Sequence, residues 1–267
     1  MSYEGKETIL RVVQQEAEGF RELANDPTRW AATTPCTEWQ VRDIVGHLVD
    51  TTEAYFVAFD AARSKTEVGP PYGITGMAAR VNTQAQALRN EPQAALLERL
   101  DADFHKMMEI FEALGPDEWG GLLVPHFYMG PLPAFFFPAF QLMDYGVHSW
   151  DLRSATGRSH GLSGEAADLL APFMFILWQS TTNPVSEGAE PYRVGIRILS
   201  GENAGDYLVT VGPEGMSYEA GPVDEAPCVL EFDPGSLVLT AFGRCNAGTI
   251  RGDRRVADTF LNQFFRL

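Results

Sequence analysis

The chain of 267 residues is long enough to bury a substantial hydrophobic core, either in one large domain or in two ordinary ones. Its composition, 45% hydrophobic and 21% charged, is typical of a soluble globular protein. The formal net charge of -16 argues against partners such as nucleic acid or an anionic membrane, because both attract basic surfaces.

The sequence also indicates a compartment. No apolar run is long enough to span a bilayer, and residues 1–20 have the pattern of a charged helix rather than a signal peptide. The cysteines Cys36, Cys228 and Cys245 are scattered and form no CxxC motif. Free thiols are typical of a reducing setting, so we expect a cytoplasmic protein. The sequence indicates no particular oligomeric state.

The first part of the chain, residues 1–160, has apolar residues at helical spacing. Helices are predicted over 5–25, 34–59, 75–90, 92–114 and 132–155. The glycine- and proline-rich stretch 115–133 is predicted to be a loop. Helices in this number and order predict a helical bundle.

Single residues predict where some of these helices begin, bend and end. Thr37 is a suitable N-cap for the second helix, and Gln40 three residues later completes the pattern of a capping box. Pro138 allows a kink in the last helix of the bundle, and Gly157 is expected to end it.

The second part of the chain, residues 161–267, changes from helical spacing to alternation. One helix is predicted over 163–181, and a final amphipathic helix over 254–267. The stretch 237–245 fits either a helix or a strand. Strands are predicted over 192–199, 206–212, 215–221 and 227–233. Strands flanked by helices predict a small α+β domain.

Three polar side chains on apolar helices suggest a metal site. Asp144 and His148 are four residues apart, so a helix places both on one face. His47 interrupts the apolar face of another predicted helix, where an unpaired imidazole would be costly. Two histidines and one carboxylate leave coordination positions open, which suits Zn²⁺ and, less well, Fe²⁺. Asp151, three residues beyond His148, is expected to hold that ligand in place by a hydrogen bond.

Simpler interpretations stand beside this one. An aspartate four residues before a histidine is a common pair on helix surfaces, and a lone histidine on an apolar helix is more often a hydrogen-bonded core residue. The aromatic run 135–140 is expected to be bundle core, with some rings forming a pocket wall before Asp144. His126, on the predicted loop, is either solvated or close to the metal or substrate. Tyr128 and Tyr145 are expected to pack rather than to donate protons.

Three segments carry a family resemblance. TPCTEWQVRDIVGHLVD and LPAFFFPAFQLMDYGVHSWDLRSATGR resemble the second and last bundle helices of DinB-like metal-binding proteins, in the branch of the mycothiol-dependent maleylpyruvate isomerases. The end of the chain, GRCNAGTIRGDRRVADTFLNQFF, resembles the sterol-carrier-like domain that follows the bundle in this branch. The resemblance implies a DinB-like four-helix bundle over 1–160 and a small α+β sterol-carrier-like domain over 161–267.

The resemblance also implies functional residues. The family's three ligands to a divalent metal, expected to be zinc, match His47, Asp144 and His148. The family carries glutamate at the position of Asp144, so the shorter aspartate alters the reach of that ligand. A functional arginine from the second domain matches Arg244 first and Arg251 second, although either fits a surface turn as well. With Asp151, Arg244 is the residue expected to serve catalysis beside the metal.

The function implied is a metal-dependent enzyme that uses a low-molecular-weight thiol, such as mycothiol, on a small organic electrophile. A metal-bound thiol ionises at neutral pH, and its thiolate attacks an electrophilic carbon. Expulsion of the thiol after bond rotation gives isomerisation, and its retention gives an S-conjugate. Two alternatives remain: a thiol-independent metal-dependent isomerase or lyase, and a noncatalytic metal-containing protein that binds a small ligand. An open coordination position favours the enzyme, and a fourth protein ligand favours the binding protein.

Overall fold

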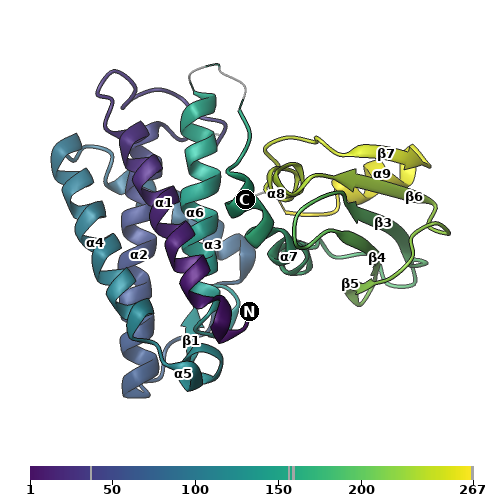
Figure 1. Ribbon diagram of the computed structural model, residues 1–267, viewed down its shortest axis with the longest axis horizontal. Coiled ribbons are helices and arrows are strands. Elements are labelled where there is room, and N and C mark those ends of the chain that lie inside the picture. The colour runs from purple at the N-terminus through teal and green to yellow at the C-terminus, as the bar shows by residue number, and fades with distance from the viewer. Residues whose placement is uncertain (37, 156, 158–159, 266–267) are drawn as a thin grey trace. The chain divides into compact units, whose positions relative to one another are not determined.

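The computed structural model describes residues 1–36, 38–155, 157 and 160–265. The chain folds into two compact units, Met1–His160 and Gly161–Leu267. The first unit is helical and the second contains a sheet with helices, which confirms the predicted fold class (Figure 1).

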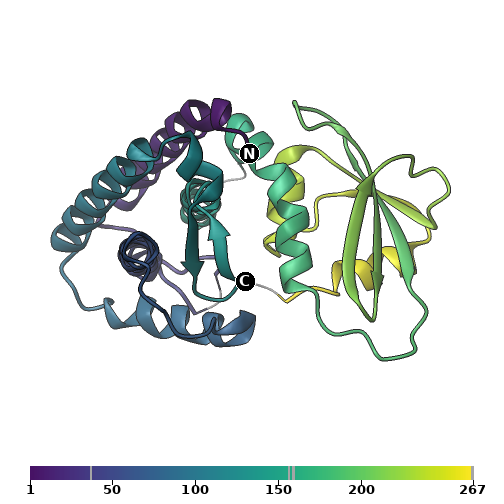
Figure 2. The ribbon, with the colours of Figure 1, turned by 90° about the horizontal axis from the view of Figure 1, so that it is seen from below.

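Long amphipathic helices form the bundle of the first unit, with α1 along α6 and α2 along α4 (Figures 1 and 2). Phe59 of α2 meets Phe111 of α4 and Phe137 of α6 edge-to-face, with ring centroids 6.1 and 5.1 Å away. These fully buried rings tie the helices together at the centre of the bundle. The helices are α1 (Lys6–Ala24), α2 (Val41–Ser64), α3 (Gly73–Ala87), α4 (Gln93–Ala113), α5 (Pro116–Gly121) and α6 (Phe136–Ser154), after a short 3-10 turn η1 (Tyr3–Gly5).

Close packing of α3 holds the part of α2 that carries His47. A side chain at Gly46 would meet the backbone oxygen of Ala85 at 2.8 Å, so only glycine allows this approach. Arg89, just beyond α3, donates from Nε and Nη2 to the buried Asp43 carboxylate, at 2.8 and 2.7 Å. The segment of α2 around His47 is therefore held both by the close contact at Gly46 and by the bidentate ion pair between Arg89 and Asp43.

The predicted start of α2 was wrong. Thr37 lies outside the described residues, and the helix begins at Val41 with Gln40 as its N-cap. The Asp43 carboxylate accepts from the Gln40 backbone N–H at 2.8 Å, which satisfies one of the donors that a helix start leaves unpaired. The chain turns before this point, because Glu38 has a φ of 74° and Trp39 N–H bonds the Cys36 carbonyl.

The stretch 115–133 is more ordered than the predicted loop. It contains α5, whose first residue is a proline, and two short antiparallel strands, β1 (Leu123–His126) and β2 (Gly130–Pro133). Helix α6 begins only after β2, at Phe136. Pro138 therefore falls in its first turn, where the missing N–H breaks no helical bond. Gly157, with a φ of 69°, follows the end of α6 as expected.

The second unit is a five-stranded sheet in the order β5-β4-β3-β6-β7, in which only the β3–β6 pair is parallel. One face is apolar and is covered by helices; Trp178 of α7 meets Phe260 of α9 at 5.2 Å (Figure 2). The strands are β3 (Tyr192–Ile198), β4 (Gly205–Gly212), β5 (Gly215–Ala220), β6 (Cys228–Phe232) and β7 (Thr249–Gly252), and the helices α7 (Gly164–Thr181), α8 (Pro234–Ala241) and α9 (Arg254–Leu261).

The end of the second unit differs in part from the prediction. In the ambiguous stretch 237–245, residues 237–241 are helical and belong to α8. Asp233 caps this helix, and Pro234 occupies its first turn. The last helix ends at Leu261, earlier than predicted, and the short strand β7 was not predicted at all. Among the described helices, none is long and apolar enough to cross a membrane.

Candidate metal centre

Two neighbouring helices bring the three predicted ligands together. His47 comes from α2, and Asp144 and His148 from α6; one ligand atom of each lies within 4.8 Å of the others. His47 Nε2 is 3.6 Å from Asp144 Oδ1, and the two imidazole rings stand 5.2 Å apart at 82°. We call this group the candidate metal centre.

Each histidine of the centre has a partner for its other ring nitrogen. His148 Nδ1 is 2.8 Å from Oδ2 of Asp151, a fully buried carboxylate. Because a carboxylate only accepts, Nδ1 is the nitrogen that carries the proton, and in the neutral imidazole Nε2 then keeps its lone pair. His47 Nδ1 lies 3.2 Å from the Thr51 hydroxyl one turn along α2, which can accept in the same way. Partners of this kind orient the imidazoles that bind metals.

A cysteine that the sequence did not single out also reaches this group. Cys36 Sγ lies 3.1 Å from Asp151 Oδ2 and 4.0 Å from His148 Nδ1. Cys36, His148 and Asp151 form a second group with ligand atoms within 4.8 Å, so His148 belongs to both. No local motif announces Cys36. Its only signal is its place in the turn that leads into α2.

Trp39 covers the two histidines from the same turn. Its ring centroid is 5.1 Å from that of His47 and 6.2 Å from that of His148. Its indole N–H donates to Asn82 Oδ1 of α3 at 2.7 Å, which fixes the ring. The helix predicted over 34–59 includes Trp39, whereas in the structure this residue precedes α2 and its ring packs against both histidines.

Aromatic residues lie on the other side of Asp144. His126, at the end of β1, has ring centroids of Tyr128 and Phe140 at 4.7 Å each. Burial lowers the pKa of His126 to about 4, and the Asp144 carboxylate opposes that shift only in part. Burial, and next the same carboxylate, raise the pKa of Tyr128 to about 12. The Asp144 charge thus acts on both rings, which remain neutral at pH 7.

The other singled-out residues have different surroundings. Tyr145 packs edge-to-face between Phe20 and Phe104, which gives it the core position that was expected. Arg251 Nε binds Glu231 Oε2 at 2.6 Å on the strand pair β6–β7. Arg244 follows α8, and its Nη1 donates to the Phe242 carbonyl at 3.0 Å.

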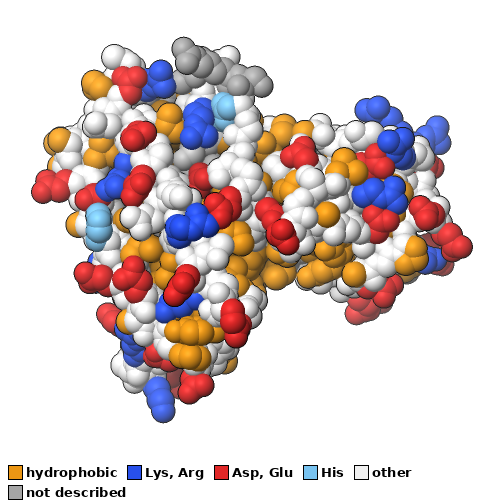
Figure 3. All heavy atoms as spheres, viewed as in Figure 1, with side chains coloured by type: hydrophobic (Ala, Val, Ile, Leu, Met, Phe, Trp, Pro, Cys, Tyr) orange, Lys and Arg blue, Asp and Glu red, His pale blue; other side chains and the backbone are white. Residues whose placement is uncertain are grey.

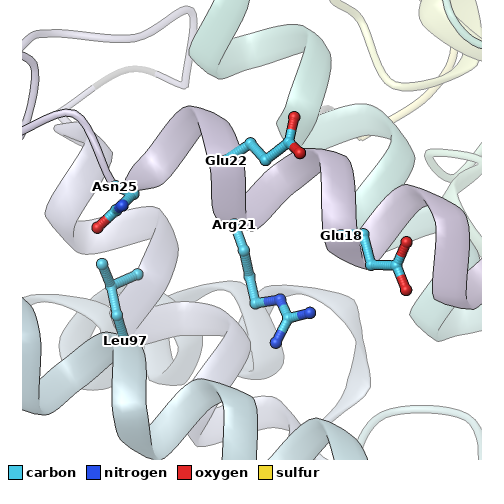
Figure 4. A pocket seen from close by; sticks show the side chains of 5 residues that line it. All are labelled: Glu18, Arg21, Glu22, Asn25 and Leu97. Carbon is cyan, nitrogen blue, oxygen red and sulfur yellow. The ribbon is translucent and has the colours of Figure 1, made fainter.

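A surface hollow of about 450 Å³ lies elsewhere in the bundle (Figure 4). It is open, it lies between α1 and α4, and Arg21, which extends into it, pairs with Asp101. None of the candidate ligands lines it, so the hollow is not part of the metal centre. Its lining residues are Glu18, Arg21, Glu22, Asn25 and Leu97.

Charged side chains are mixed over the surface. Figure 3 shows lysine and arginine side chains scattered among acidic ones on the face in view. Arg99 binds Glu53 through two hydrogen bonds, of 2.6 and 2.7 Å. Because both side chains are exposed, this pair contributes only about 0–1 kcal/mol to the free energy of folding.

A protein-family model matches the first part of the chain. The model described as the mycothiol maleylpyruvate isomerase N-terminal domain matches residues 13–153. The matched range covers more than half of the chain and includes all three residues of the candidate metal centre together with Asp151.

Solved structures share the fold. A crystal structure of the mycothiol-dependent maleylpyruvate isomerase aligns over 100% of both chains, with a TM-score of 0.65 and 13% identity. A histidine-to-alanine mutant of it gives 0.63 and 12%, again over 100% of both chains. A colibactin self-resistance protein in complex with double-stranded DNA gives only 0.47 and 17%, over 58% of this chain and 97% of that one. No curated protein is similar enough in sequence to match. The likeness to the first two structures concerns the fold alone.

Proposed function

Because the chain belongs to the mycothiol maleylpyruvate isomerase N-terminal domain family, we propose that it is a metal-dependent enzyme of thiol chemistry. It uses a low-molecular-weight thiol, such as mycothiol, to isomerise or S-conjugate a small organic electrophile. The observation that carries the proposal is the convergence of His47, Asp144 and His148 within 4.8 Å.

The donor set of the candidate metal centre fits a divalent ion such as Zn²⁺. Two imidazoles and one carboxylate are three of the ligands that a catalytic zinc site uses, and they leave a position for a further ligand. The hydrogen bond from His148 to Asp151 supports this fit, because it selects the neutral tautomer in which Nε2 has the lone pair that a metal needs. A divalent metal held here would supply a Lewis acid that lowers the pKa of a bound thiol.

The residues of this chain have definite tasks in the proposed reaction. Asp151 and Thr51 hold the two histidines, and Asp144 adds the negative charge that a cation needs. Trp39 lies over both imidazoles and limits the access of water to them. The low-molecular-weight thiol contributes the sulfur nucleophile.

The proposed reaction of the thiol with its substrate needs no oxidant. The thiolate forms a C–S bond to a conjugated carbon, and the electron pair of the C=C bond moves onto the adjoining carbonyl. Rotation about the resulting single bond followed by loss of the thiolate restores the double bond in the other geometry. If a proton is added instead, the product is the S-conjugate.

Arg244 remains our proposed contact for a carboxylate of the substrate or thiol. Its planar guanidinium group can bind a carboxylate through two parallel hydrogen bonds. Arg244→Ala should lower kcat/KM about ten- to a hundredfold, and Arg244→Lys should recover part of the loss. Arg254→Ala, which removes an exposed arginine from α9, is the matched control. Unchanged kinetics of Arg244→Ala would remove Arg244 from the site.

The proposed function is tested with maleylpyruvate and mycothiol, the substrate and thiol in the name of the structurally similar isomerase. Zinc-loaded protein should isomerise maleylpyruvate only when mycothiol is present, and His47→Ala should abolish the reaction. His105→Ala, an exposed histidine of α4, is the control. Turnover without any thiol would instead support the thiol-independent isomerase or lyase.

A further inference from the structure

His126 has a buried nitrogen with no protein partner among the described residues. The side chain is only 6% exposed, and Nδ1 is buried without a hydrogen bond. Leaving such a group unpaired is costly, because it loses its hydration and gains no hydrogen bond in return. Packing alone does not require a polar ring here, because a phenylalanine would fill the same space without this cost. A bound molecule can supply the partner that this buried nitrogen lacks.

Several aromatic rings pack around His126. We call Tyr55, Tyr128, Phe137 and Phe140 the aromatic cluster; their ring centroids lie 4.7 to 6.2 Å from that of His126. The backbone of His126 is held by pairing with Gly130 across the β1–β2 ribbon. The ring is therefore held in place on its backbone side and packed among aromatic rings.

The aromatic cluster borders the candidate metal centre on two helices. Phe137, Phe140 and Asp144 share one face of α6, spaced by three and four residues. Tyr55 lies two turns along α2 from His47, on the face of Thr51. In keeping with this spacing, burial and then the Asp144 charge raise the pKa values of Tyr55 and Tyr128, and the same charge opposes the lowering of the His126 pKa by burial.

The border between the two groups is also where the surface is reached. Asp144, Tyr128 and Phe140 are half-buried, whereas His126 and Phe137 behind them are buried. A small molecule that enters beside Asp144 therefore meets the ligands of the centre on one side and aromatic rings on the other.

We propose that His126 binds the substrate: its buried Nδ1 forms a hydrogen bond with a carbonyl oxygen of the small molecule whose other end lies at the candidate metal centre. The aromatic cluster favours an uncharged oxygen at this point, because a second carboxylate would lose its hydration in this buried place. The ligand class is thus a short chain with a metal-binding carboxylate at one end and a ketone or similar carbonyl further along. This inference rests on the proposed function for the presence of a metal-bound small molecule.

Two probes of equal chain length test the hydrogen bond without turnover. Levulinate (4-oxopentanoate) and pentanoate share the carboxylate and differ in one ketone. Their dissociation constants are measured by calorimetry on zinc-loaded wild-type protein at pH 7.5. A neutral hydrogen bond should make levulinate bind about three- to tenfold more tightly than pentanoate.

Variants assign that preference to His126. His126→Phe keeps an aromatic ring but no polar nitrogen, and it should bind both probes equally. His126→Asn keeps a short polar side chain, and it should recover part of the preference. His105→Asn, at an exposed histidine of α4, should behave as wild type. Thermal unfolding and zinc content, measured for every variant, show that fold and metal are kept.

The outcomes separate this inference from the proposed function. A wild-type protein without preference for levulinate, or a preference that survives in His126→Phe, overturns the role of His126. Absence of mycothiol-dependent turnover of maleylpyruvate contradicts the proposed function instead, and it leaves a His126-dependent levulinate preference standing.

Discussion

The two sides of Asp144 differ in how their polar groups are satisfied. Toward Trp39, both histidines of the candidate metal centre have a hydrogen-bond partner for Nδ1, and Asp151 accepts from His148 and from Cys36. Toward β1, the buried Nδ1 of His126 has no protein partner among the described residues. The first side is organised before a ligand arrives, as a cation site should be. The second lacks a group that a bound molecule can supply.

The largest effect on zinc affinity should come from removing one of the predicted ligands. His148→Ala takes one donor from the candidate metal centre and leaves Asp151 without its imidazole partner. We expect zinc affinity to fall by more than about a hundredfold, which exceeds the loss typical for residues behind the ligands. Competition with a chelator of known zinc affinity measures it. His160→Ala, a histidine outside the centre, should leave the affinity unchanged.

The pH dependence of stability tests the other side. The pKa of His126 is about 4 in the folded protein and about 6.5 when unfolded. As pH falls from 6.5 to 4, His126 is protonated in the unfolded chain but not in the folded chain. The free energy of unfolding therefore decreases across that window. The loss should be on the order of 3 kcal/mol.

His126→Phe should lack this contribution, so its free energy of unfolding should fall less steeply between pH 6.5 and 4. Urea unfolding of the metal-free proteins measures the difference. The raised pKa of Asp103, about 6, acts in the opposite direction, but it is common to both proteins and cancels. Identical slopes for both proteins would show that His126 is not held neutral by burial.

A moderate effect on zinc affinity is expected for Asp151, which hydrogen-bonds the predicted ligand His148. Asp151→Asn keeps an oxygen acceptor near His148 Nδ1 but loses the charge that makes the imidazole more basic. Zinc affinity should therefore fall about ten- to a hundredfold, with the fold retained. Asp117→Asn, in the exposed first turn of α5, serves as the control. A loss no larger than that of the control would mean that Asp151 does not support the centre.

The smallest effect should come from Cys36. Its thiol is a weak donor to Asp151 at 3.1 Å, so Cys36→Ser keeps a donor there and should change zinc affinity less than about tenfold. Cys228→Ser, at a cysteine of the other unit, controls for general effects of the change. A loss as large as that of His148→Ala would show that Cys36 is itself a ligand.

Much of the centre could be predicted because it depends on helical spacing. His47 stood out as a polar residue on an apolar helix, and Asp144 and His148 as a pair one turn apart. The family match over 13–153 confirmed the resemblance that these segments carried. The helical part followed by an α+β part was also predictable, because the period of apolar residues changes from one part of the chain to the other.

Other features depend on contacts that spacing does not reveal. Cys36 and Trp39 reach the histidines through a turn in which Glu38 has a positive φ. Glutamate rarely adopts this conformation, so the sequence does not predict the turn. The strands β1 and β2 are short and rich in proline, so they carry no alternating pattern. Whether His126 is solvated or buried depended on the rings that surround it, which come from α2 and α6.

Cobalt spectroscopy tests the central claim most directly, because it identifies both the metal and its ligands. Co²⁺ titrated into the metal-free protein should bind once per chain, with a visible spectrum of nitrogen and oxygen ligands. A thiolate-to-cobalt charge-transfer band should appear only after mycothiol is added. If no Co²⁺ binds, the candidate metal centre is refuted. If the charge-transfer band is present before mycothiol and disappears in Cys36→Ser, the metal lies instead among Cys36, His148 and Asp151.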